Sequence, residues 1–303
     1  MKARFLTPVV TAFDENGKLD IQSNKNVYDH LINGGIDGIV ILGSTGEFFN
    51  MPLSQQKDLI DLAVGYVNKR TKVYIGTSCM SIEDTIEMAN YAHNAGADAV
   101  MIISPYYFSL SDESIEYFYD QVAAGTEANI YLYNFPDRTG YDLSQEITLR
   151  LVRKNKNIVG YKDTVTVISH TRALISLMQS EFPEFDVLSG FDENFVHNVL
   201  CGGGGCIGGL SNLAPEIFSA WVKAVNEKDF DKMAKLQKTV DKMMKLYDIG
   251  IPFIPIIKKA MIIRGIDMKD YCTKPFLEAN KKQVEQIIAI MKEVNLFSIG
   301  CLI

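Results

Sequence analysis

The chain has 303 residues, of which 47% are hydrophobic and 22% are charged, so it has the composition of a folded globular protein and is long enough to bury a sizeable core. Its formal net charge of −7 argues against nucleic acid or an anionic membrane surface as the main partner. An anionic substrate would therefore have to be held locally, by backbone N–H groups, hydroxyls or single arginines.

The N-terminal segment and the cysteines are typical of a cytoplasmic protein. Asp14 and Glu15 interrupt the first apolar run too early for a signal peptide, and no apolar stretch approaches membrane-spanning length. The five cysteines lack C-x-x-C spacing and fit buried thiols in a reducing compartment. The four histidines lack ligand spacing, so we expect no metal site.

Strand-like and helix-like segments alternate along most of the chain. Strands are predicted at residues 5–13, 38–42, 72–76, 99–103, 129–133, 158–161, 185–188 and 206–208. Helices are predicted at residues 21–33, 54–68, 82–94, 113–124, 144–154, 169–181, 193–200 and 216–226. Eight alternating strand–helix units predict an α/β fold with a parallel sheet closed as a (β/α)8 TIM barrel.

A doubly wound sheet is the competing architecture. It would be expected to carry a G-x-G-x-x-G phosphate loop after its first strand, and none is present there. Four glycines occur at residues 202–205, but they follow a predicted helix and precede a strand. This order favours a flexible turn over a phosphate-binding loop.

Three further helices are predicted after the eighth unit, at residues 231–247, 253–264 and 277–293. No low-complexity linker separates them from the preceding segments. We therefore expect a catalytic barrel over residues 1–228 and a C-terminal three-helix extension, residues 229–303, packed on it.

Lys162 follows a short apolar segment that is predicted to be a buried strand. Burial disfavours the charged form of a lysine, and a neutral amine is the form that attacks a carbonyl to make a Schiff base. Thr164 would share the same face of the strand. The alternative is a lysine at the end of a strand that points into solvent.

The segment after the second strand reads GSTGE, at residues 43–47. In TIM barrels the chemistry is located at the C-terminal ends of the strands, where this segment would lie. The hydroxyls of Ser44 and Thr45 and the backbone around Gly46 suit a carboxylate ligand. A plain turn that ends in a helix cap is the alternative.

Tyrosines and an arginine follow the fourth and fifth strands, in the sequences SPYY at residues 104–107 and YNFPDRTG at residues 133–140. A phenol close to a neutral lysine can move protons during imine formation and carbon–carbon bond cleavage. Arg138 could bind a second carboxylate. The alternatives are packing for the tyrosines and a solvated charge for the arginine.

Small and acidic residues follow the seventh and eighth strands. Gly190 and Gly209 would leave room for a ligand in the mouth of the barrel. Asp192 and Glu193 could accept hydrogen bonds from polyol hydroxyls, or could cap the next helix.

In their order along the chain, these motifs closely resemble the dihydrodipicolinate synthase/N-acetylneuraminate lyase family. Several motifs in one order are more specific than any one of them. The motifs are GSTGE at 43–47, PYY at 105–107, YN-x-P at 133–136, GYKDT at 160–164 and SG-x-D at 189–192.

The resemblance implies a cofactor-free class I aldolase or lyase that handles pyruvate as a Schiff base. Lys162 would then be the imine-forming lysine and Tyr133 the proton relay. Ser44 and Thr45 would bind the carboxylate of the keto acid. Tyr107 matches a tyrosine that, in the synthases, reaches across a subunit interface toward the neighbouring active site, so the resemblance implies a catalytic role for Tyr107, as for Thr45, and a homotetramer built as a dimer of dimers.

The choice of family member depends on a few positions. Ser44 replaces the threonine usual in synthases, and residues 163–172 look more like bacterial 2-keto-3-deoxygluconate aldolases. Arg138, by contrast, matches the arginine with which synthases bind the aldehyde substrate. The synthase Gly-Thr-Gly is GTSC here, at residues 76–79, and Gly209 stands where sialic acid lyases carry a serine.

We therefore expect reversible cleavage of a 2-keto-3-deoxy sugar acid to pyruvate and an aldehyde. The alternatives are dihydrodipicolinate synthase, which condenses pyruvate with aspartate semialdehyde, and N-acetylneuraminate lyase. A non-catalytic barrel that binds a keto acid is a further alternative, but its expected signature, loss of the lysine or the tyrosine, is absent.

Overall fold

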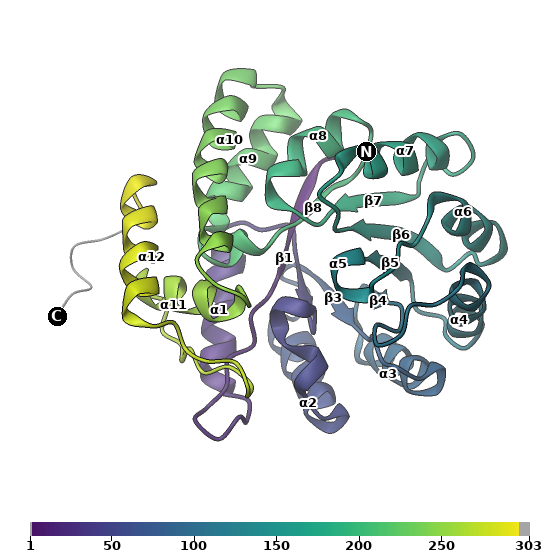
Figure 1. The fold of residues 1–303 in the computed structure, drawn as a ribbon, viewed down its shortest axis with the longest axis horizontal. Helices are drawn as coiled ribbons and strands as arrows, with labels where there is room; N and C mark the ends of the chain where they lie inside the picture. The colour runs from purple at the N-terminus through teal and green to yellow at the C-terminus, as the bar shows by residue number, and fades with distance from the viewer. Residues whose placement is uncertain (1, 297–303) are drawn as a thin grey trace. The chain divides into compact units, whose positions relative to one another are not determined.

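The structure is a computed structural model that describes residues 2–296. Within these residues, eight parallel strands follow one another from β1 to β8 in a closed barrel, which confirms the predicted (β/α)8 TIM barrel. The strands, all but β2 labelled in Figure 1, are β1 Arg4–Pro8, β2 Gly38–Ile41, β3 Lys72–Gly76, β4 Ala99–Ile103, β5 Ile130–Asn134, β6 Ile158–Asp163, β7 Asp186–Ser189 and β8 Gly205–Ile207.

Helices alternate with these strands. They are α1 Ile21–Asn33, α2 Leu53–Val67, α3 Ile82–Ala95, α4 Asp112–Ala124, α5 Pro136–Thr139, α6 Gln145–Lys154, α7 Ile168–Gln179, α8 Phe195–Leu200 and α9 Pro215–Glu227. Serine or aspartate side chains accept hydrogen bonds from backbone N–H groups at the start of several of them, as Ser81 does for α3 and Ser144 for α6. The short helix α5 was not predicted, and it begins with Pro136, which suits a first helical position.

The contacts divide the chain into two units. The first contains residues up to Arg4 together with Lys72–Ile207, and the second contains Phe5–Thr71 and the chain from Gly208 onward. In the first unit, strands β3 to β8 pair in sequence order, and almost all of their residues are buried. Helices α3, α4, α6 and α7 pack each against the next, as Figure 1 shows.

The second unit contains the C-terminal helices α10 Phe230–Met244, α11 Ile254–Ile263 and α12 Lys281–Glu293. Helix α10 packs on α9 and α12, and α11 packs on α12. A domain boundary at residue 228 stays a prediction.

Two predicted segments have different bounds in the structure. The first strand ends at Pro8 and not at residue 13, because side chains bind the backbone that follows: Asn212 Oδ1 accepts from the N–H of Val10, and Asn24 Oδ1 from that of Ala12. The last helix begins at Lys281 and not at residue 277, because Asn280 and Gln283 form a capping box there.

A third difference lies in the predicted helix at residues 231–247. Helix α10 ends at Met244, and a 3-10 turn, η5 Lys245–Asp248, follows it. Among residues 2–296, no helix is both long enough and apolar enough to cross a lipid bilayer.

Candidate active site

Lys162 lies within strand β6, between β5 and β7, and its side chain is buried at 6% exposure. The strand runs to Asp163, two residues further than the sequence predicted, so the lysine is part of the buried ladder and does not merely follow it. The register of β5 and β6 sets Lys162 opposite Tyr133. Nζ of Lys162 lies 4.2 Å from the centroid of the Tyr133 ring.

Tyr133 is itself buried, at 4% exposure, and stacks on Phe135 with 6.1 Å between ring centroids. The Arg138 guanidinium carbon lies 5.1 Å from the centroid of the same Phe135 ring. Arg138 is exposed on helix α5 and forms no ion pair with another of residues 2–296. Arg138 thus packs on the ring of Phe135, which in turn stacks on Tyr133. The charge of Arg138 stays in solvent.

Thr164 and Gly190 lie close together after the ends of β6 and β7. The backbone N–H of Gly190 donates to the carbonyl of Asp163 at 2.7 Å. A Cβ on Gly190 would lie 1.9 Å from Oγ1 of Thr164, so this close approach requires glycine. Oγ1 of Thr164 is buried and has no hydrogen-bond partner among residues 2–296, so its hydroxyl is suited to a polar ligand atom.

Asp192 is fully buried at the start of the 3-10 turn η3 Asp192–Asn194, and Glu193 beside it is half-buried. The neighbouring thiol of Cys206, in β8, is also fully buried. Burial and the charge of Asp192 raise the pKa of Cys206 well above its usual value, while a hydrogen bond with Ser189 and the charge of Lys162 act in the opposite direction. Cys206 therefore lies near both Asp192 and Lys162, a relation that the sequence did not predict.

The GSTGE segment belongs to the second unit. Ser44, Thr45 and Gly46 form the 3-10 turn η1 Ser44–Gly46, in which the two hydroxyl-bearing residues are half-buried. Leu42 and Glu47, on either side of the turn, have φ angles of 58° and 62°. Such values cost a residue other than glycine about 1–3 kcal/mol each, and strain of this kind clusters at functional sites.

Glu47 is an internal anchor for this segment. Its carboxylate is fully buried, pairs with the fully buried Lys258 of α11 at 2.5 Å, and accepts from Thr273 N at 2.7 Å and Oγ1 at 2.8 Å. Lys258 also donates to the carbonyl of Tyr271 at 2.8 Å. Sequence reasoning missed Lys258, although a lysine in the apolar stretch IPIIKKAMII was a signal of an internal partner.

Gly209 lies in the 3-10 turn η4 Gly209–Asn212, which follows β8 and also belongs to the second unit. A Cβ on this glycine would lie 2.6 Å from the hydroxyl oxygen of Tyr247 and 3.3 Å from the ring of Phe253. These two rings stack, with centroids 3.9 Å apart. The C-terminal helical segment therefore occupies the space that a larger side chain at residue 209 would need.

Tyr107 lies away from the buried group. It is 79% exposed and packs edge to face on Phe108, which is 73% exposed. The first unit therefore brings together Lys162, Tyr133, Thr164 and Gly190, and leaves Tyr107 exposed. Within the described residues, no group of three or more His, Cys, Asp and Glu side chains could hold a metal ion.

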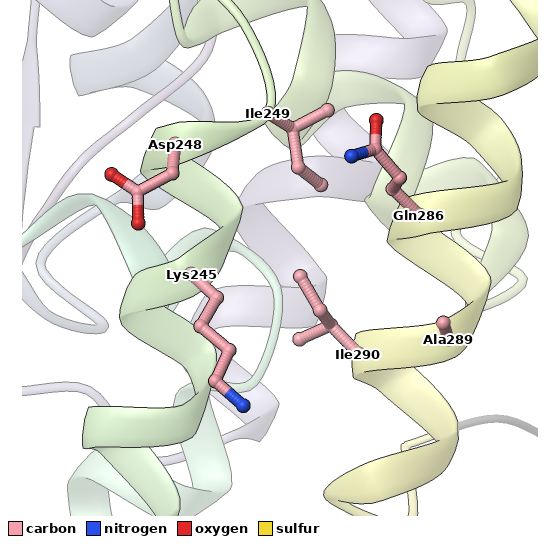
Figure 2. Close-up of a pocket in the computed structure, with 6 residues that line it drawn as sticks. All are labelled: Lys245, Asp248, Ile249, Gln286, Ala289 and Ile290. Atoms are coloured by element: carbon pink, nitrogen blue, oxygen red, sulfur yellow. The ribbon is translucent and has the colours of Figure 1, made fainter.

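A surface groove of about 280 Å³ lies between η5 and α12. Figure 2 shows its lining, in which Ile249, Ile290 and Ala289 stand among three polar side chains. One of these, Lys245, pairs with Glu293 at 3.1 Å. None of the predicted site residues lines this groove, so it is not the candidate active site.

The model of the dihydrodipicolinate synthetase family matches residues 1–294 of this chain. The chain belongs to that family. This confirms the resemblance inferred from the motifs, and the protein is accordingly a carbon–carbon lyase of the pyruvate aldolase type. Members of the dihydrodipicolinate synthetase family use pyruvate through a lysine Schiff base.

Relatives within the dihydrodipicolinate synthetase family carry two kinds of name. The chain is 35% identical to the probable 2-dehydro-3-deoxy-D-pentonate aldolase YjhH of Escherichia coli K12, over 94% of this chain and 95% of that one. It is 28% identical to the 4-hydroxy-tetrahydrodipicolinate synthase of Thermotoga neapolitana, over 96% of this chain and 98% of that one.

A third relative connects sequence and structure. The putative 2-dehydro-3-deoxy-D-gluconate aldolase YagE of Escherichia coli K12 is 32% identical, over 96% of each chain. The crystal structure of YagE in complex with pyruvate matches with a TM-score of 0.95, over 97% of this chain and 99% of that one, at 31% identity.

Proposed function

We propose that this protein cleaves a 2-keto-3-deoxy sugar acid reversibly to pyruvate and an aldehyde, through a Schiff base on Lys162. The observation that carries the proposal is the buried amine of Lys162 held 4.2 Å from the centroid of the Tyr133 ring. The names of YjhH and YagE, both aldolases of 2-dehydro-3-deoxy acids, support the substrate class. The pyruvate in the YagE structure supports the keto-acid half.

In the proposed mechanism, the amine of Lys162 adds to the C2 carbonyl of the substrate, one proton is taken up and water leaves, which gives a protonated imine. The C3–C4 bond then breaks, and its electron pair moves toward the imine nitrogen to form an enamine. Loss of the C4 hydroxyl proton leaves the aldehyde product. Protonation of the enamine at C3 and hydrolysis of the imine release pyruvate and the free lysine.

Tyr133 is the group that we assign to the proton transfers. It comes from the strand next to that of Lys162, and its phenol can both donate and accept a proton. Its ring is fixed by burial and by stacking on Phe135, so the hydroxyl is held by a packed element and not by a mobile loop.

Most of the remaining predicted residues are assigned to substrate binding. Ser44, Thr45 and Gly46 would bind the carboxylate of the keto acid, because the strained turn offers hydroxyls and backbone N–H groups without a net positive charge. Thr164 would donate its buried hydroxyl to the bound substrate. Asp192 and Glu193 would accept hydrogen bonds from the substrate hydroxyls, beside the small residues Gly190 and Gly209.

The second candidate is 4-hydroxy-tetrahydrodipicolinate synthase, in which the same imine condenses with aspartate semialdehyde. Arg138 favours it, since its exposed guanidinium lies on the Phe135 ring that packs on Tyr133 and could bind a second carboxylate. The Thermotoga neapolitana relative also supports it. N-acetylneuraminate lyase is less favoured, because Tyr247 fills the space beside Gly209 that a serine would need.

We further propose a cofactor-free, cytoplasmic homotetramer arranged as a dimer of dimers. The exposed pair Tyr107 and Phe108 supports an interface on that part of the surface, because contiguous exposed aromatics favour contact with another chain. The chain's net charge of −7 supports small-molecule partners, with neither nucleic acid nor a membrane among them.

The test is a pyruvate-release assay over a panel of 2-keto-3-deoxy acids, with condensation of aspartate semialdehyde and pyruvate run beside it. Release from a sugar acid with no condensation is the expected result. Condensation alone would replace the first proposal with the synthase. Neither reaction, together with reversible pyruvate binding, would support a non-catalytic barrel.

A further inference from the structure

The residues that directly follow Tyr133 and Lys162 hold each other across the two strands. Asn134 pairs in register with Asp163, and its Nδ2 donates to Oδ1 of Asp163 at 3.1 Å. The same amide donates to Oδ1 of Asp142 at 2.7 Å. Because successive residues of a strand point to opposite faces, Asn134 and Asp163 lie behind the face that carries the tyrosine and the lysine.

His170 closes this group from helix α7. Its Nδ1 lies 2.9 Å from Oδ2 of Asp163, and its Nε2 lies 3.0 Å from Oδ2 of Asp142. Carboxylate oxygens only accept hydrogen bonds, while a neutral imidazole donates from only one of its nitrogens. Two such contacts at once therefore require the doubly protonated, positively charged ring.

The surroundings favour that charge. Burial by itself lowers the pKa of His170, but the hydrogen bonds and charges of Asp142 and Asp163 outweigh it and raise the pKa to about 10. Thr171 Oγ1 donates to the same oxygen of Asp163 at 2.7 Å. Tyr161, on β6, is a further titratable group near these carboxylates, and burial together with their charges raises the pKa of its phenol.

Three separate segments meet at this group. Asp163 belongs to β6, His170 to α7, and Asp142 to the segment between α5 and α6. The backbone is held at the same place: the N–H of Thr164 donates to the carbonyl of Asn134 at 2.9 Å. The group therefore joins the ends of β5 and β6 to the helical layer directly behind Tyr133 and Lys162.

We propose that His170 is a positioning residue, which as an imidazolium between Asp163 and Asp142 fixes the ends of β5 and β6 and so holds Lys162 against Tyr133. The proposal rests on the function assigned above to Lys162 and Tyr133. Neither His170 nor Asp142 touches the substrate in this account.

The test compares His170→Gln and Asp142→Asn with a matched control, His93→Gln, which replaces an exposed histidine of α3. We expect His170→Gln to lower kcat for the cleavage reaction by roughly 10- to 100-fold with little change in KM, because misplacement of reacting groups acts on the bound complex. His93→Gln is expected to match the parent.

The pH profile separates positioning from a merely structural role. The parent should lose kcat as the pH rises through about 10, where His170 loses its proton. Asp142→Asn removes one of the charges that raise this pKa, so the loss should begin at lower pH. In the imidazole nitrogen NMR spectrum at pH 8.5, the His170 ring signals, assigned by their absence from His170→Gln, should be those of a charged imidazole in the parent.

Hydrogen exchange gives a readout that does not depend on turnover. The amides of Thr164 and Gly190, which bond to Asn134 and Asp163, should exchange faster in His170→Gln and Asp142→Asn than in the parent and His93→Gln. If kcat, the pH profile and these amides are all unchanged in both variants, the positioning role is wrong. If borohydride traps no pyruvate on the parent, the proposed function fails, and the exchange rates still decide whether His170 holds the two strands.

Discussion

Nζ of Lys162 lies 4.2 Å from the centroid of the Tyr133 ring, across the paired strands β6 and β5. The two residues are direct partners in the strand register, so their contact is set by the backbone ladder. Both side chains are buried, at 6% and 4% exposure. An amine held against a phenol in this way is the pair that imine formation and proton transfer require.

Tyr133→Phe removes the hydroxyl and keeps the ring that packs on Lys162. We expect pyruvate still to be trapped on the variant by borohydride, but more slowly than on the parent, while kcat for cleavage falls roughly 100- to 10,000-fold, the usual effect of losing a general acid–base group. Tyr117→Phe, at a tyrosine that is 61% exposed, is the matched control. Unchanged turnover in Tyr133→Phe would remove Tyr133 from the mechanism.

Arg138→Ala distinguishes the two enzyme proposals. Because its guanidinium is exposed and is proposed to bind only the second carboxylate of aspartate semialdehyde, in the synthase alternative, we expect cleavage of a sugar acid to change by no more than about twofold, as for an ordinary surface substitution. Arg153→Ala, which removes an arginine paired with Glu181 on the surface, is the control. A large loss confined to aspartate semialdehyde turnover would support the synthase and contradict the first proposal.

Glu47→Gln should destabilise the protein strongly, because it leaves the fully buried Lys258 without its partner. Breaking one side of a buried ion pair typically costs about 3–5 kcal/mol of unfolding free energy, whereas replacing both sides costs much less. Urea unfolding of Glu47→Gln and of Glu47→Gln/Lys258→Met measures both effects. The exposed pair Lys245–Glu293 offers the control Glu293→Gln, for which we expect no measurable change. Equal stability of Glu47→Gln and the parent would show that the pair does not anchor the turn.

Gly190→Ala should lower both stability and activity. The added Cβ would lie 1.9 Å from Oγ1 and 2.9 Å from Cα of Thr164, so the backbone after Lys162 would have to move. Overpacking of this kind costs about 1–3 kcal/mol. Gly65→Ala, in α2, meets nothing within 4 Å and should stabilise the helix by about 0.5–1 kcal/mol. Thermal unfolding of the two variants checks the contrast, and a Gly190→Ala protein as stable and active as the parent would refute the close contact.

The barrel could be predicted from the sequence because strand and helix periods alternate strictly along the chain. The burial of Lys162 could be predicted for a related reason, since a lysine beside an apolar strand segment is a local signal. The predicted ends of the elements were less accurate. Strand β1 ends at Pro8 because the side chains of Asn212 and Asn24 bind the backbone after it. Such distant partners are not visible in a local sequence pattern.

Other residues were missed in the sequence for the same reason, because their partners come from other parts of the chain. The sequence places Glu47 at the end of the GSTGE segment, which predicts a carboxylate-binding loop or a plain turn, but its partner Lys258 is more than two hundred residues away in the sequence. His170 stands in a stretch noted only for its resemblance to sugar-acid aldolases, and its role depends on Asp142 and Asp163 meeting it in space. Thr77 carries a further buried hydroxyl without a partner among the described residues, after the end of β3.

The central claim is tested most directly by borohydride reduction of the protein in the presence of pyruvate, followed by intact and peptide mass measurement. The account predicts one reduced pyruvyl adduct per chain, located on Lys162 and absent from Lys162→Ala, while Lys162→Ala keeps the fold. No adduct on the parent, or an equal adduct on Lys162→Ala, would contradict the account.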